Sequence, residues 1–214
     1  MEGGETHILN KPSLRDLKKE ATAHALADAA FELAVERGLD GFVVDDVVQR
    51  AGYSRRTFAN YFSCKEEAVA TAVIPYSTNQ QHEAERLLDS LPENTPLLDA
   101  LYQLMKLQFL ESLLLKMREV VSLSNTHPTL EPYILSVFRG LQISAMETLN
   151  GLSHGRYPNG YTHLLVGAVY GAMLPVIDGT LNVLLPGDAV NPEQDATTFE
   201  EYLETTFRYL RNGF

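Results

Sequence analysis

The sequence predicts an all-α protein of about nine helices, with a small N-terminal head and a larger C-terminal body. Three observations support this fold class. Apolar residues recur at helical spacing through several long segments, and clusters of Gly, Pro and Asn separate these segments. No segment shows a convincing strand pattern, and the chain has no internal repeat.

The head is expected to contain four helices. A long helix is predicted over residues 14–37, followed by two short helices and by a longer one over residues 65–91 that would link the head to the body. Ser63 and Glu66 have the spacing of a capping box at the start of that last helix. The predicted core of the head consists of Leu26, Leu33, Val47, Phe58 and Phe62.

Proline and glycine breaks divide the rest of the chain. Predicted body helices cover residues 96–111, 112–125, 127–152, 161–185 and 197–211. Residues 1–12 show no periodicity and are expected to form a flexible arm. The predicted domains are a helix-turn-helix domain over residues 13–70 and a ligand-binding and dimerisation domain over residues 71–214.

Residues 38–62 have the pattern of a helix-turn-helix. A short apolar-faced helix ends at Gly52, where glycine accepts the left-handed backbone of a helix C-terminus. Ser54 can cap a second short helix over residues 55–61. A helix of this width fits the DNA major groove. The side chains on it that can bond to base edges or phosphates are Arg55, Arg56, Thr57 and Asn60.

The distribution of charge agrees with a DNA-binding head. The net charge of the 214 residues is −11, which by itself argues against nucleic acid. However, residues 47–65 hold four basic residues and no acid, and residues 11–19 hold four basic residues beside one acid. Residues 76–214 carry 8 basic and 16 acidic residues. An acidic body should weaken non-specific DNA binding and leave affinity to a small basic face.

Several other classes of protein are disfavoured. The single Cys64 excludes an internal disulfide and a Cys-rich zinc site, and the six His residues lack metal-ligand spacing. No catalytic triad order, P-loop or dinucleotide fingerprint occurs, so we expect no enzyme activity and no cofactor. The longest apolar stretch, residues 164–177, is too short to span a bilayer, and no signal peptide is recognisable. A cytoplasmic protein without a membrane partner is expected.

The segment 161–185 indicates a homodimer. It is apolar on all sides, so one face needs a partner beyond the body's own core. Gly167, Ala168, Gly171 and Ala172 are small enough for close helix approach. Together with the amphipathic segment 197–211 it would form a four-helix interface. A dimer would hold two heads on successive major-groove faces of a palindrome.

Together these features resemble one family, the TetR-type (tetracycline-repressor-like) transcriptional regulators. The resemblance covers roughly residues 22–70. It rests on Ala29-Ala30, Glu36-Arg37-Gly38, Val44-Asp45-Asp46-Val47-Val48, Ala51-Gly52-Tyr53-Ser54, Thr57-Phe58 through Phe62, and Lys65-Glu66. Three residues depart from the family pattern: Val43 replaces a helix-capping Thr, Ala59 an aromatic that often touches DNA, and Ala23 a frequent Arg.

The resemblance implies a homodimeric repressor that a small molecule releases from a palindromic operator in double-stranded DNA. It places Tyr61 and Lys65 on the DNA backbone. It also implies an effector cavity in the body. The candidate lining residues are Met105, Phe109, Met117, Phe138, Gln142, Met146, Tyr170 and Met173.

Two other hypotheses stay open from the sequence. The protein could be a ligand-independent DNA-binding dimer whose body is a protein-interaction module. It could also be an enzyme that carries a helix-turn-helix head, although no residue pattern supports that.

Overall fold

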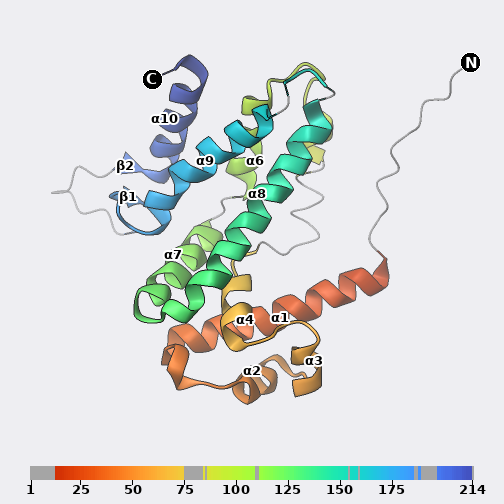
Figure 1. Ribbon diagram of the computed structural model, residues 1–214, viewed down its shortest axis with the longest axis vertical. Helices are drawn as coiled ribbons and strands as arrows, with labels where there is room; N and C mark the ends of the chain where they lie inside the picture. The colour runs from red at the N-terminus through yellow and green to blue at the C-terminus, as the bar shows by residue number, and fades with distance from the viewer. Residues whose placement is uncertain are drawn as a thin grey trace, which may run out of the picture.

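The computed structural model describes residues 13–74, 84, 86–108, 111–153, 155–158, 160–185, 188 and 197–213. These residues form α-helices, two short 3-10 helices and one pair of two-residue strands, which confirms the all-α prediction (Figure 1). Among the described residues, no helix is both long and apolar enough to cross a membrane. The predicted arm, residues 1–12, lies outside the described residues.

The head is built around the long helix α1. Its elements are α1 (Leu14–Arg37), η1 (Leu39–Gly41), α2 (Val44–Ala51), α3 (Arg55–Ala59) and α4 (Lys65–Thr71). Ser13 begins α1 with a capping box, in which its Oγ accepts the Asp16 N–H and the Asp16 carboxylate accepts the Ser13 N–H, each at 3.2 Å. All five predicted core residues of the head are at most 6% exposed.

The link between α2 and α3 has the predicted geometry. Gly52 adopts φ 74°, ψ 30°, and its N–H donates to the Val48 carbonyl at the end of α2. The Ser54 Oγ then accepts the Thr57 N–H at 3.0 Å and begins α3. Val43 has no side-chain oxygen to cap α2, and only the reciprocal half of a capping box is present, in which the Asp46 carboxylate accepts the Val43 N–H at 2.9 Å.

The predicted cap of α4 is wrong by one residue. Cys64, not Ser63, is the N-cap, and its Sγ accepts the Glu67 N–H at 3.4 Å. The partner carboxylate belongs to Glu67, not Glu66. Its Oε2 accepts both the N–H and the Oγ–H of Ser63, at 2.7 and 2.6 Å. The sequence spacing alone could not show which of the two adjacent residues has the N-cap backbone conformation.

The predicted continuous helix over residues 65–91 is also wrong. Helix α4 ends at Thr71, and residues 72–74 form a turn and a bend. Pro75 explains the end, because a proline has no N–H to donate to the residue 71 carbonyl and disfavours helical backbone just before it. Residues 86–90 are helical again, and most of the segment between lies outside the described residues.

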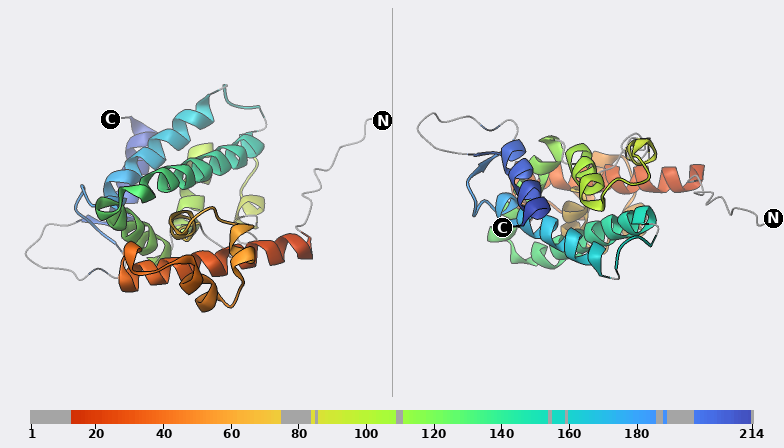
Figure 2. Two further views of the ribbon diagram at one scale, coloured as in Figure 1. Left: turned by 60° about the horizontal axis from the view of Figure 1, so that its bottom comes forward. Right: turned by 90° about the horizontal axis from the view of Figure 1, so that it is seen from above.

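The body packs its helices on the side of α1 opposite to α2 and α3 (Figures 1 and 2). Its elements are α6 (Leu97–Gln108), α7 (Glu111–Thr126), η2 (Pro128–Leu130), α8 (Glu131–Ser153), α9 (Tyr161–Ile177), β1 (Val183–Leu184), β2 (Thr197–Thr198) and α10 (Phe199–Asn212). Helix α10 packs through the fully buried Phe207, whose ring centroid lies 4.9 Å from that of Tyr102 on α6.

Helix α9 is shorter than the predicted 161–185. Its C-cap Asp178 donates its N–H to the Leu174 carbonyl, and Gly179 leaves the helix with φ 76°. The chain then forms β1, which pairs in parallel with β2 in the register Val183↔Thr197. The apolar residues after Ile177 therefore belong to a turn and a strand, which the helical apolar pattern did not reveal.

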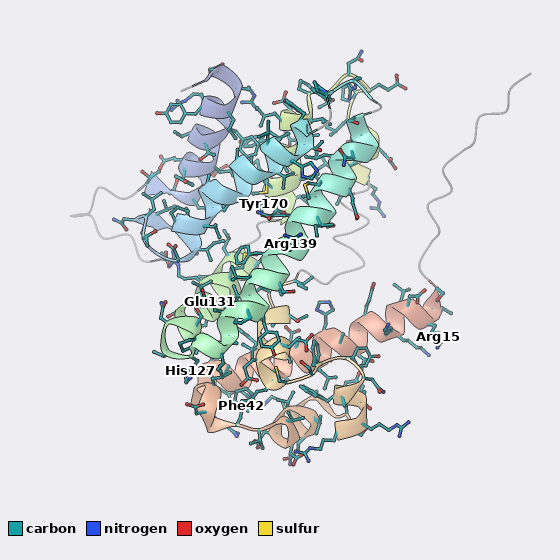
Figure 3. The ribbon with its side chains drawn as sticks, in the orientation of Figure 1. Arg15, Phe42, His127, Glu131, Arg139 and Tyr170 are labelled. Atoms are coloured by element: carbon teal, nitrogen blue, oxygen red, sulfur yellow. The ribbon has the colours of Figure 1, made fainter. Side chains whose placement is uncertain are left out.

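Polar side-chain contacts join the head to the body. Lys116 on α7 reaches Asp28 on α1, with Nζ 2.7 Å from Oδ1. At the other end of the junction, His127 Nδ1 lies 3.7 Å from Oδ2 of Asp40 on η1, close to Phe42 (Figure 3). Helix α4 packs between α1 and the N-terminal part of α8, so the head contacts the body through three of its elements.

Candidate nucleic-acid interface

The recognition helix predicted from sequence is α3. Its inner side is fixed by Phe58, which is 3% exposed and lies 5.5 Å, between ring centroids, from Phe62. Arg55 and Arg56, the first two residues of α3, are both exposed. Thr57 is half-buried, and its Oγ1 lies 2.8 Å from the Ser54 Oγ, so its hydroxyl is engaged at the helix start.

Arg55 is paired within the head. Its Nε lies 2.8 Å from Oδ1 of Asp45, the second residue of α2, and both side chains are more than 60% exposed. The pair joins the N-terminal turns of the two helices of the motif. Among the described residues, Arg56 forms no ion pair. The two adjacent arginines of α3 therefore differ in their electrostatic surroundings.

Arg50 and Lys65 were counted as basic residues of the recognition segment, but the structure engages both. The Arg50 guanidinium donates to both carboxylate oxygens of Glu36, at 2.8 and 2.6 Å. This hydrogen bonding lowers the pKa of Glu36 and raises that of Arg50. The Lys65 Nζ donates to the carbonyls of Leu39 and Phe42, at 2.6 and 2.8 Å.

The Lys65 ammonium also lies over the Phe42 ring, 4.9 Å from its centroid. An ammonium group has three N–H donors, and the two carbonyls occupy two of them. A role for Lys65 on DNA phosphate stays a prediction. Its position shows a second role, which is to fix the chain after α1 to the start of α4.

Asn60 and Tyr61 lie beside the N-terminal turns of α1. Together they line an open groove of about 650 Å³. The other lining residues are Ser13, Arg15, Asp16, Lys18, Lys19 and Thr22. Arg15 lies near the free end of α1 (Figure 3). Arg15, Lys18 and Lys19 therefore extend the basic surface from α3 to the start of α1. The helix-turn-helix motif alone predicts no basic residues there.

Two sets of site residues were missed in the sequence reading. Arg15, Lys18 and Lys19 were recognised as a basic cluster, but their position beside Asn60 and Tyr61 depends on the packing of α1 against the head. Asp45, the ion-pair partner of Arg55, was not among the predicted site residues. The sequence offers little signal for this pair, because Arg55 is ten residues away along the chain and Arg50 is nearer.

The candidate effector residues fall into two groups. Met105, Met117, Tyr170 and Met173 are at most 7% exposed and belong to one hydrophobic cluster of the protein. Phe138, Gln142 and Met146, on α8, are half-buried. Phe109 lies outside the described residues. Helices α6, α7, α8 and α9 each contribute candidate effector residues. Residues of an ordinary hydrophobic core are buried in the same way.

Tyr170 is the most distinctive polar group in that region (Figure 3). Its hydroxyl donates to the Leu141 carbonyl at 3.4 Å, a long hydrogen bond. Burial raises the pKa of Tyr170 to about 12, so the hydroxyl is neutral and able to donate at physiological pH. In the described part of the chain, no group of three His, Cys, Asp or Glu side chains is arranged to hold a metal ion.

Comparisons with known proteins agree with this architecture. The family model for the tetR family of bacterial regulatory proteins matches residues 26–70, from the middle of α1 to the end of the head. A relative from Mycobacterium tuberculosis (strain ATCC 25618 / H37Rv) is named "Putative mycofactocin biosynthesis transcriptional regulator MftR". It is 28% identical over 127 residues, which make up 58% of this chain and 61% of the relative, so the chain spans less than two thirds of that protein.

A solved structure shares the fold over nearly the whole chain. It is described as a "putative TetR-family transcriptional regulator" from Mesorhizobium loti MAFF303099. The TM-score is 0.51 and the sequence identity 16%, and the match covers 91% of this chain and 95% of that one. The helix-turn-helix head thus matches the tetR family of bacterial regulatory proteins over residues 26–70, and the all-α fold of the chain is similar to that of a solved TetR-family structure.

Proposed function

We propose that the protein is a homodimeric repressor that binds a palindromic operator through α3 and is released from it by a small molecule. The observation that carries the DNA-binding part is the exposed polar side of α3, held in place by the buried Phe58. The groove lined by Arg15, Lys18 and Lys19 adds cations at the edge of the same head. Contacts from α3 to base edges would then specify the sequence, and contacts from α1 to phosphates would position the head on the duplex.

The outer face of α9 supports the dimer. Leu164 is 77% exposed and Leu174 is 47% exposed, and between them lie the exposed small residues Gly167, Ala168 and Gly171. A Cβ added at Gly167 or Gly171 would meet no atom within 4 Å, so the protomer's own packing does not require glycine there. An apolar helix face with a flat centre suits the close approach of an identical helix.

Helix α10 contributes less to this interface than the sequence suggested. Its apolar residues Phe199, Leu203 and Phe207 are buried in the protomer's own core. Its outward side carries Glu200, Glu204 and Arg208. We therefore assign the centre of the dimer interface to α9, with α10 at its polar edge.

A pair of glycine variants tests the dimer. We expect Gly171→Arg on α9 to fold normally and to become monomeric, because a long charged side chain would enter the apolar contact. Gly140→Arg on α8 is the matched control, since Gly140 is also exposed, helical and free of neighbours within 4 Å. Light scattering after size-exclusion chromatography and operator affinity are the readouts. A Gly171→Arg protein that stays dimeric would contradict the assignment of α9.

Selection from a randomised duplex library tests DNA binding. We expect the protein to enrich a palindrome, and the Arg55→Ala/Arg56→Ala double variant to lose that site. Enrichment of a single asymmetric half-site would speak against a dimeric reader. Retention of the selected site by the double variant would speak against α3 as the recognition helix.

The effector part of the proposal is supported by the buried methionines of α6, α7 and α9 and by Tyr170. Met side chains adapt to different apolar ligands, and a long hydrogen bond such as that of Tyr170 can be exchanged for one to a ligand. A ligand can shift DNA binding only by its differential affinity for the two conformations. Because α4 ends at Thr71, we assign the coupling to the α1–α7 and α4–α8 contacts instead of one continuous helix.

A compound panel tests release. We expect at least one apolar compound to raise the melting temperature of the free protein and to weaken its binding to the selected duplex. Compounds that raise the melting temperature without changing DNA affinity would contradict release. That outcome would favour the alternative, a ligand-independent dimer whose body binds another protein.

A further inference from the structure

The two arginines at the start of α3 have different neighbours, although they are adjacent in sequence. The Arg55 Nε lies 2.8 Å from the Asp45 carboxylate, which projects from the first turn of α2. Both side chains are exposed, at 70% and 64%, so the pair stands at the surface of the head where DNA is proposed to bind. Arg56 forms no ion pair with any described residue.

The carboxylate changes what Arg55 can bind. A guanidinium beside a carboxylate forms a pair with no net charge, so its attraction for a phosphate anion is weak, and Asp45 adds repulsion. The pair closes through Nε, so N–H groups at the terminal nitrogens stay available. These can bond to neutral acceptors such as O6 and N7 of guanine, which a nearby carboxylate does not repel as it repels phosphate.

Four other cations near the proposed DNA-binding surface form no ion pair with a carboxylate of the described residues. Arg56 is exposed on α3, and Arg15, Lys18 and Lys19 line the groove beside Asn60 and Tyr61. Asp16 is the one acidic residue that lines that groove, and its carboxylate is engaged by Ser13. Arg56, Arg15, Lys18 and Lys19 are therefore candidates for binding phosphate. Of the two arginines of α3, only Arg55 has a carboxylate partner, among the described residues, that opposes phosphate binding.

We propose that Asp45 is a specificity-determining residue, which holds Arg55 for base reading and keeps it from binding phosphate. The inference rests on the proposed function, because it assumes that α3 enters the major groove. It divides the roles of the two arginines: Arg55 reads a base, and Arg56 binds the backbone. Asp45 acts through Arg55 and is a positioning residue.

Asp45→Asn tests the proposal with the duplex that wild-type protein selects from a randomised library. The variant keeps the size of the side chain and removes its charge. Freed from the carboxylate, Arg55 should bind phosphate, so the slope of log K against log salt should steepen by about 0.9 per head. Discrimination against duplexes with one substituted base pair should fall by about two- to fivefold at the position read by Arg55, as expected for loss of an exposed ion pair.

Three further variants separate this role from other effects. Asp45→Glu retains the charge and should restore most of the discrimination and the original slope. In an Arg55→Ala background, Asp45→Asn should change neither quantity, because the residue acts through Arg55. Asp40→Asn removes the same charge from the body-facing side of the head, beside His127, and should leave discrimination unchanged. Circular dichroism and melting temperature verify that each variant is folded.

The outcomes distinguish the inference from the proposed function. If wild-type protein selects no sequence, the DNA-binding proposal is wrong, and the inference about Asp45, which depends on it, is wrong too. If wild-type protein selects a site and Asp45→Asn keeps both the slope and the discrimination, the inference alone is wrong. It is also wrong if Asp40→Asn reproduces the effect, because net charge would then explain it, or if the effect persists without Arg55.

Discussion

Lys65 offers the sharpest test of how the head is built, because two different roles predict two different results. The structure engages its Nζ with the Leu39 and Phe42 carbonyls and places it over the Phe42 ring. If that role dominates, Lys65→Met should destabilise the protein and leave the salt dependence of DNA binding unchanged. If Lys65 is mainly a phosphate ligand, the variant should keep its stability and lose about 0.9 from the salt slope per head.

The size of the expected loss follows from the contacts. Each hydrogen bond from a charged donor contributes about 1.5–3 kcal/mol when its partner is buried. Lys65 is half-buried, so water can reach the freed carbonyls and the lower end applies, with about 0.5–1 kcal/mol more for the cation–π contact. Two such bonds at about 1.5 kcal/mol each, together with the cation–π contact, give a total of about 3.5–4 kcal/mol. For a chain of this length, that corresponds to a decrease in melting temperature of about 7–16 °C.

The assay compares Lys65→Met with Lys18→Met at one protein concentration. Lys18 is exposed in the groove beside Asn60 and Tyr61, so its replacement should leave the melting temperature unchanged and reduce the salt slope. Thermal unfolding followed by circular dichroism and DNA affinity over a salt series give the two readouts. A Lys65→Met protein as stable as wild type would refute the structural role argued here.

Three further outcomes are expected from the packing. Asp46→Asn should cost about 0.5–2 kcal/mol in the free energy of unfolding, because it weakens the acceptor for the Val43 N–H at the start of α2; urea titration measures it. Arg50→Met should be less stable than wild type at neutral pH. The pair with Arg50 lowers the folded pKa of Glu36 below its ordinary 4.5, so the difference should shrink as the pH falls through that lowered pKa, and urea midpoints across an acid series would show it. Phe207→Ala should cost about 3–5 kcal/mol by leaving a cavity against Tyr102, and a loss below about 1 kcal/mol would mean that α10 is not packed as described.

Interactions between residues close in sequence were sufficient to predict the helix-turn-helix. Gly52 and Ser54 act on backbone groups within a few residues, so their effect on the turn and on the start of α3 is readable without tertiary structure. The periodicity of α1 likewise identified Leu26 and Leu33 as core residues. By contrast, the end of α4 was missed although Pro75 was visible, because the apolar pattern was extended across it.

The sequence by itself determined the fold class, the helix-turn-helix and the order of the helices, because caps, helical periodicity and chain breaks are interactions between near neighbours. Only the tertiary structure decided which cations remain available. It joins Arg50 to Glu36, Lys65 to the carbonyls after α1, and Arg55 to Asp45. These partners are between ten and 26 residues apart in the chain, and the direction of a side chain across such a separation depends on how the helices pack.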